Sequence, residues 1–115
     1  VIQLYFDGII QYDEAALRKA FHPKASVIGT TSDGAQEWEP FQEWVVYTRG
    51  DAPDPAGRVN TIVSIDITGR AAVVKTDLNW PSAHYTDYLS LLKIDGEWKI
   101  VNKIWHRDKP SAQAQ

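Results

Sequence analysis

The fold is decided by two runs of alternating residues that meet at an Asp-Gly corner, YTDYLSLLKIDGEWKIVNKIWHR, residues 85–107. A period of two along each run predicts β-strands, and Asp95-Gly96 between them is a strong signal for a two-residue hairpin turn. Such a turn fixes the cross-strand partners, so that Lys93 faces Trp98 and Leu91 faces Ile100. The stretch therefore predicts a tight antiparallel hairpin in which each residue has a defined face.

The same alternation extends upstream. It predicts strands over Arg58–Ile67, Arg70–Trp80, Ala83–Ile94 and Glu97–Arg107. If every corner is a two-residue turn, one face of these strands is strongly apolar and should meet a second layer. That inner face takes in Val59, Thr61 and Val63 of the first strand, Tyr85 and Asp87 of the third, and Asn102, Ile104 and His106 of the last.

The N-terminal half has helical spacing instead. Helices are predicted up to about Gly8, from Asp13 to about His22, where Pro23 ends the pattern, and from Pro40 to Thr48. A short strand is predicted at Ala25–Gly29, and residues 50–57 have the composition of a loop. This order of elements predicts a single α+β domain over residues 1–109, followed by a frayed tail over residues 110–115.

Composition narrows the function classes. The chain has 115 residues, a formal net charge of -3 and no cysteine. Without a basic excess it is not expected to bind nucleic acid, and without cysteine it has neither a thiolate nucleophile nor a disulfide. No apolar run approaches the roughly 20 residues of a membrane span, and no signal-peptide pattern is present. A cytoplasmic location is favoured, and the helix-like start at Val1–Phe6 leads us to expect further residues upstream.

Polar side chains interrupt the inner face near one end of the last hairpin. Asp87, Asn102, His106 and Tyr85 all fall there, and a carboxylate in an apolar wall needs hydrogen-bond partners or a wet cavity. We therefore predict that these residues line a pocket, with Asp87 and His106 as candidates for proton transfer. The alternative is a satisfied structural network that ties the sheet to a helix.

Three aromatic residues outside the strands are further candidates. Trp44 lies in the apolar stripe of the third helix, while Tyr47 and Tyr12 are expected at the pocket edge as hydrogen-bond donors. The histidines do not have the spacing of metal ligands, because His22, His84 and His106 lie far apart in the chain. No metal and no cofactor are expected.

The outer face of the sheet is polar, yet it carries too many large apolar groups for a surface exposed to water. Aromatic and aliphatic side chains mixed with lysines are typical of protein interfaces. We predict a homodimer through this face, formed by Ile62, Val73, Tyr88, Leu92, Val101 and Trp105.

Three segments carry a resemblance to a known family: residues 5–8 with Asp13, residues 17–23 (LRKAFHP), and residues 86–93 followed by residues 96–103. They resemble the bacterial family labelled "putative lumazine-binding", within the nuclear-transport-factor-2-like superfamily of cystatin-like folds. That superfamily also includes ketosteroid isomerase, scytalone dehydratase and polyketide cyclases. The resemblance implies a strongly curved antiparallel sheet wrapped around the N-terminal helices as a cone with a pocket, usually in a dimer.

The residues leave open whether the pocket is catalytic. The first hypothesis is a pocket protein that binds a small, largely apolar or aromatic molecule. The second is a cofactor-free isomerase, dehydratase or cyclase that uses Asp87 with His106 or a tyrosine. The inner face of the predicted strands holds no second acidic residue, which weighs against it. The third is a protein-interaction domain with a vestigial pocket.

Overall fold

The computed structural model describes residues 1–48, 57–81 and 83–108. Helices α1 (Ile2–Gln11) and α2 (Glu14–Ala20) open the chain, and α3 (Phe41–Trp44) continues directly into the 3-10 helix η1 (Val45–Thr48). The strands are β1 (Phe21–Thr31), β2 (Gln36–Pro40), β3 (Val59–Thr68), β4 (Ala71–Asn79), β5 (His84–Ile94) and β6 (Glu97–Asp108). The predicted frayed tail, and all but the last residue of the predicted loop at residues 50–57, lie outside the described residues.

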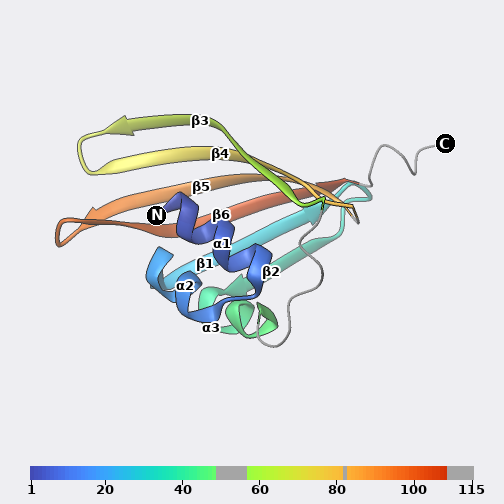
Figure 1. The fold of residues 1–115 in the computed structure, drawn as a ribbon, viewed down its shortest axis with the longest axis horizontal. Helices are drawn as coiled ribbons and strands as arrows, with labels where there is room; N and C mark the ends of the chain where they lie inside the picture. Colours follow the sequence, from blue (N-terminus) through green and yellow to red (C-terminus); the bar gives the residue numbers. More distant parts are fainter. Residues whose placement is uncertain (49–56, 82, 109–115) are drawn as a thin grey trace.

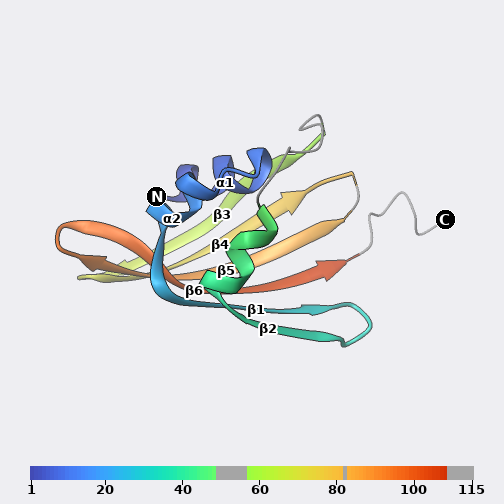
Figure 2. The same cartoon turned by 90° about the horizontal axis from the view of Figure 1, so that it is seen from below.

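The predicted α+β class is confirmed. All strands join one six-stranded sheet in the order β2-β1-β6-β5-β4-β3, antiparallel throughout except for the parallel pair β1–β6. The helices lie on one side of this strongly curved, unclosed sheet (Figures 1 and 2). Side chains of both layers fill the core between them, including Tyr5, Leu17, Phe21, Leu89 and Ile100. None of the described helices is long and apolar enough to cross a bilayer.

The helices start where the sequence predicts but differ in length. The Asp13 carboxylate accepts a hydrogen bond from the Ala16 amide at 3.2 Å, so it caps α2 as expected. Helix α1 continues past Gly8 to Gln11, so Gly8 does not end it. This glycine allows close packing of α1 on α2, since a Cβ there would lie 2.6 Å from Leu17 Cγ. Helix α2 ends at Ala20, earlier than predicted, and Phe21 already begins β1.

The predicted strand register is confirmed for β4 and β5. Leu78 pairs with Tyr85 and Thr76 pairs with Asp87. Next to the Asp-Gly corner, Leu91 pairs with Ile100, as the two-residue turn requires.

Further along, two β-bulges overturn the predicted faces. Ser90 pairs with Asn102 while Leu91 pairs with Ile100, so Val101 is an extra residue without a partner on β5. Each residue of β6 beyond it turns to the face opposite the predicted one: Lys103, Trp105 and Arg107 point inward, and Asn102, Ile104 and His106 point outward. A bulge at Val63 likewise reverses the facing of the first part of β3. Asn60 and Ile62 point inward there, in place of the predicted Val59, Thr61 and Val63.

The outer face changes accordingly. Ile62 and Trp105, predicted there, belong to the inner face, and Val101 lies in the bulge. The exposed apolar side chains on the outer face of the central strands are Val73, Tyr88, Leu92 and Ile104.

Candidate functional site

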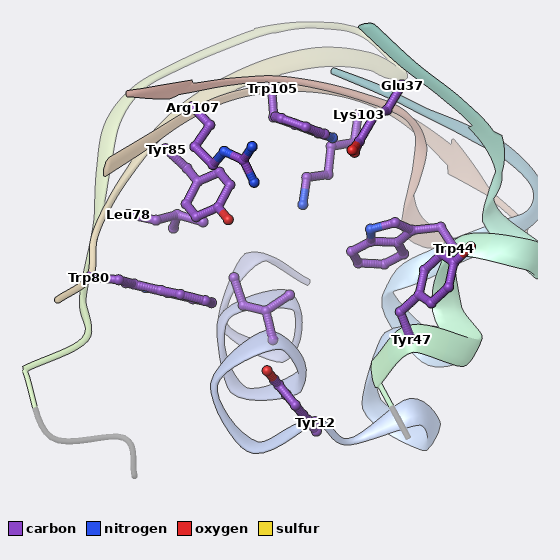
Figure 3. A pocket seen from close by; sticks show the side chains of 11 residues that line it. Tyr12, Glu37, Trp44, Tyr47, Leu78, Trp80, Tyr85, Lys103, Trp105 and Arg107 are labelled. Carbon is purple, nitrogen blue, oxygen red and sulfur yellow. The ribbon is translucent and has the colours of Figure 1, made fainter. Parts of the chain in front are cut away.

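A hollow of about 280 Å³ opens between the inner face of the sheet, the end of α1 and the α3–η1 segment. We call it the sheet pocket. Aromatic rings predominate in its walls, and its full lining is Ile9, Tyr12, Glu37, Trp44, Tyr47, Leu78, Trp80, Tyr85, Lys103, Trp105 and Arg107 (Figure 3). Tyr12 reaches the pocket from the C-cap of α1, where its backbone is left-handed (φ 53°) and its amide donates to the Gly8 carbonyl.

A row of packed rings forms the wall on the sheet side. The ring centroids of Trp80 and Tyr85 are 5.8 Å apart and those of Tyr85 and Trp105 are 6.0 Å apart, both edge to face. Trp80 is held by its indole N–H, which donates to Asn60 Oδ1 at 2.8 Å, and by the Arg58 guanidinium, 4.5 Å from its ring. The wall is therefore fixed in place and apolar.

Gly29 of β1 makes room for the Trp105 ring. The two residues are neighbours in the β1–β6 register. A Cβ at Gly29 would lie only 1.8 Å from Trp105 Cε2, so any larger residue would have to displace the indole. The position of this pocket wall thus depends on a glycine of the neighbouring strand.

Beneath the pocket lies a buried acid. Asp87 is fully buried, and its Oδ2 accepts hydrogen bonds from the Tyr5 hydroxyl and from Thr76 Oγ1, the latter at 3.4 Å. Its other oxygen, Oδ1, has no hydrogen-bond partner among the described residues. Burial, reinforced by the negative charge of Asp87, raises the pKa of Tyr5 well above its usual value, so the phenol stays protonated and donates.

Lys103 connects this acid to the pocket. Its Nζ lies 4.0 Å from Asp87 Oδ2, beyond hydrogen-bond distance, and 4.7 Å and 4.9 Å from the ring centroids of Trp44 and Tyr5. The side chain is 7% exposed, and Figure 3 shows its amine directed into the hollow. Burial lowers the pKa of Lys103, although the nearby Asp87 charge acts in the opposite direction.

Polar groups also reach the hollow from its rim. Glu37 enters from β2 and Arg107 from the end of β6, so the sheet pocket carries a carboxylate, an amine and a guanidinium (Figure 3). Tyr47 stands at the edge, and a hydrogen bond to Glu39 together with that residue's charge raises its pKa.

The structure brings together some of the predicted site residues and separates others. Tyr12, Trp44, Tyr47 and Tyr85 line the sheet pocket, and Asp87 lies next to Lys103 of its lining. Because of the bulge at Val101, the other two predicted site residues, Asn102 and His106, lie on the outer face. Asn102 Nδ2 donates to Ser26 Oγ at 3.0 Å, and His106 Nε2 lies 3.0 Å from Asp108 Oδ1.

Sequence reasoning missed Tyr5, Glu37, Lys103, Trp105 and Arg107. Strict alternation assigned the last three to the outer face, and β2, which supplies Glu37, was not predicted. One available signal was the pair Ile100-Val101, two adjacent β-branched residues at the point where the alternation of polar and apolar residues breaks off. Another was the placement of a tryptophan, Trp105, on a face predicted to be polar.

The site has no metal-binding arrangement in the part of the chain that the structure describes. No group of three or more His, Asp or Glu side chains is close enough there to hold an ion. The chemistry available in the pocket is that of an amine, a carboxylate, a guanidinium and phenols.

Comparison with known proteins identifies the family. A family model described as "Putative lumazine-binding" matches residues 1–106. A curated protein from Cladobotryum sp., named aldolase FrzH, is 50% identical over 108 residues, which are 89% of this chain and 82% of that protein.

Solved structures agree with this assignment. A nuclear-transport-factor-2-like protein of unknown function from Shewanella baltica is 30% identical, with a TM-score of 0.80 over 92% of this chain and 86% of that one. One from Silicibacter pomeroyi has a TM-score of 0.82 at 24% identity, over 92% and 88% of the two chains, which shows the shared fold. The chain therefore belongs to the family described as putative lumazine-binding and has the nuclear-transport-factor-2-like fold.

Proposed function

We propose that this protein is a cofactor-free enzyme that forms or cleaves a carbon–carbon bond next to a carbonyl group, an aldol-type reaction. The observation that carries the proposal is the combination, in one aromatic pocket, of two cationic groups directed inward, Lys103 and Arg107. The name of the Cladobotryum relative, an aldolase at 50% identity, supports the same reaction class.

The chemistry of the pocket suits this reaction. An aldol step requires loss of a proton from the carbon beside a carbonyl, and negative charge then develops on the carbonyl oxygen. A buried cationic group such as Lys103 stabilises such charge more than it would in bulk solvent. Glu37 supplies a carboxylate in the same hollow that is able to accept the proton.

The size and lining of the pocket indicate the substrate class. A volume of about 280 Å³ is at the small end of ligand pockets, which typically range over roughly 300–1,000 Å³. The rings of Trp44, Trp80 and Trp105 offer flat apolar surfaces with polar groups at one side. We therefore propose a small carbonyl compound with an aromatic or apolar body.

A fluorogenic cleavage assay tests the function. The probe is a β-hydroxy ketone with a methoxynaphthyl group, whose cleavage releases the fluorescent naphthaldehyde and acetone. Cleavage should exceed the rate in buffer and in the presence of an equal concentration of serum albumin. Exchange of the α-protons of an aryl ketone in heavy water, followed by NMR, provides a second readout. The proposal is wrong if neither reaction is faster than these backgrounds.

A second candidate function is binding without turnover, which was the first hypothesis from the sequence. The aromatic lining favours it, because indole and phenol rings also stack on a flat heteroaromatic ligand. Quenching of tryptophan fluorescence by lumazine tests this candidate, and Trp80→Leu should weaken the quenching. Saturable quenching together with no turnover in either assay above would favour binding over catalysis.

A further inference from the structure

We propose that Lys103 is the nucleophile of the site and that its amine forms a covalent imine with the carbonyl carbon of the substrate. This inference rests on the proposed aldol function and gives it a mechanism. The evidence is the position of Lys103, the way Asp87 is already hydrogen-bonded, and the apolar surroundings of the amine.

The bulge at Val101 sets the position of Lys103. Without the extra residue, Lys103 would point away from the helices, as the alternation of the sequence predicts. With it, the side chain is buried except where its amine meets the sheet pocket. A carbonyl group held in the hollow is therefore accessible to this nitrogen.

The amine is not held in a tight ion pair. Asp87 Oδ2 already accepts from the Tyr5 hydroxyl and from Thr76, and the Lys103 nitrogen stays 4.0 Å away. Within the described residues, the structure gives Lys103 Nζ no hydrogen bond; instead it faces the rings of Tyr5 and Trp44. No hydrogen bond between the amine and the described residues has to be broken before the nitrogen attacks, although the attraction to Asp87 at 4.0 Å favours the charged form.

Burial adds to this reactivity. A lysine reacts with a carbonyl only as the neutral amine, and desolvation lowers the pKa of Lys103 and so increases that fraction near neutral pH. The ionisable groups around it are Asp87 and Tyr5 beneath, and Glu37, Tyr85 and Arg107 in the pocket. Of these, Asp87 is the group whose charge opposes the shift.

The steps balance without a cofactor. The neutral amine adds to the carbonyl carbon, and the resulting carbinolamine takes up a proton and loses one water to give a protonated imine. Loss of the α-proton to a pocket base converts this into a neutral enamine, whose carbon attacks the carbonyl of the second substrate and forms the new bond. The alkoxide formed in this attack takes the proton back from the base, and the nitrogen is again part of a protonated imine. One water then hydrolyses the imine and releases the product and the free amine, so the water lost earlier is returned.

Asp87 has a separate role in this scheme. Its carboxylate lies 4.0 Å from the nitrogen that carries the positive charge in the protonated imine. It therefore stabilises that intermediate, and Tyr5 and Thr76 hold it in place. We regard Asp87 as a positioning and charge-balancing residue, because it does not line the pocket.

Reductive trapping tests the inference. The full chain is incubated with methoxynaphthaldehyde and sodium cyanoborohydride, which reduces an imine to a stable secondary amine. Each adduct adds the mass of one aldehyde less one oxygen, and peptide mapping locates it. At limiting aldehyde, the adduct should form on Lys103 before it forms on the exposed Lys93 of β5.

Matched variants complete the test. Lys103→Met should abolish the early adduct and reduce cleavage of the hydroxy ketone by roughly 100-fold or more. Lys103→Arg keeps the positive charge but cannot form an imine, so this variant should also lose the early adduct and the cleavage of the hydroxy ketone. Lys93→Met should change neither, and circular dichroism with thermal melting verifies that each variant is folded.

The outcomes separate the two proposals. An adduct on Lys103 with neither cleavage nor α-proton exchange above background would support the amine assignment and overturn the aldol function. Cleavage that survives Lys103→Met would leave the aldol function standing and overturn the imine. Labelling that is spread evenly over the exposed lysines, without a preference for Lys103, would also overturn the imine proposal.

Discussion

At the scale of single residues, the Tyr5–Asp87 hydrogen bond shows how a buried negative charge is stabilised. Both side chains are fully buried, and Asp87 Oδ1 lacks a partner among the described residues, so the carboxylate depends on what binds Oδ2. Thr76 at 3.4 Å is the weaker of the two hydroxyl donors because of its length. The Tyr5 hydroxyl is therefore the stronger of the two hydrogen-bond donors to this carboxylate.

Tyr5→Phe should destabilise the protein measurably. It removes one hydrogen bond to a charged, buried group and keeps the ring, so the free energy of unfolding should fall by about 1.5–3 kcal/mol. Urea unfolding followed by circular dichroism measures this change. Tyr88→Phe, at an exposed position of β5, is the matched control and should cost a few tenths of a kcal/mol at most. Equal losses in the two variants would contradict the assigned role of Tyr5.

The pH dependence of Lys103 labelling has a definite sign. The ammonium form does not react, so the rate of reductive trapping should rise with pH and level off above the pKa of Lys103. Because this pKa is lowered from 10.5, the midpoint should lie below 10.5. Asp87→Asn removes the charge that opposes the shift, so the midpoint should move to still lower pH. A midpoint that rises in Asp87→Asn would contradict the geometry described here.

At the scale of elements, the pairing of β1 with β6 determines the shape of the pocket. Gly29→Ala should displace the Trp105 ring, because a Cβ there would overlap it. We expect weaker retention of methoxynaphthaldehyde in equilibrium dialysis and a lower melting temperature. Thr61→Ala, at an exposed position of β3, should change neither. Unchanged dialysis in Gly29→Ala would mean that the Trp105 ring does not form part of the binding surface.

The elements also show what a sequence can and cannot predict. The Asp95-Gly96 corner and the two-residue gap predicted between the strands ending at Trp80 and starting at Ala83 led to the correct register of β4 with β5 and of the first part of β6, because a gap of two residues leaves no freedom in the pairing. They also placed Asp87 and Tyr85 correctly on the inner face.

The parts of the fold and of the site that the sequence did not predict depend on contacts between distant segments. The bulges at Val63 and Val101 have no local signature comparable to Asp-Gly, and the second one reverses the facing of Lys103 and His106. Strand β2 was missed because its alternation is short and its side chains are largely exposed. About half of the candidate site therefore followed from the sequence, and its cationic half did not.

At the scale of the whole molecule, the outer face of the sheet still presents apolar side chains to solvent. Val73, Tyr88, Leu92 and Ile104 are each 42–44% exposed on adjacent strands. We propose that this face forms a homodimer, as the sequence pattern predicts for Val73, Tyr88 and Leu92. A contiguous apolar surface of this kind is typical of subunit interfaces.

Sedimentation tests the dimer. At micromolar concentration the protein should have a mass near twice 13.0 kDa. Tyr88→Lys combined with Ile104→Lys, a cross-strand pair, should yield a monomer, because like charges would meet across the interface. Ile67→Lys, at an exposed apolar position on the inner side of β3, should leave the dimer intact. The reverse result, with only Ile67→Lys dissociating the protein, would move the interface to the other side of the sheet.

The unpaired residue at Val101 has a consequence for how such pockets diversify. If this irregularity moved beyond Arg107, an amide and an imidazole, Asn102 and His106, would enter the cavity in place of the amine and the guanidinium. Ile104 would also replace Trp105 on the inner face, while chain length, sequence and strand order would stay the same. In this fold the position of a single β-bulge therefore decides which functional groups line the pocket. Two relatives with nearly the same backbone fold need not share a reaction.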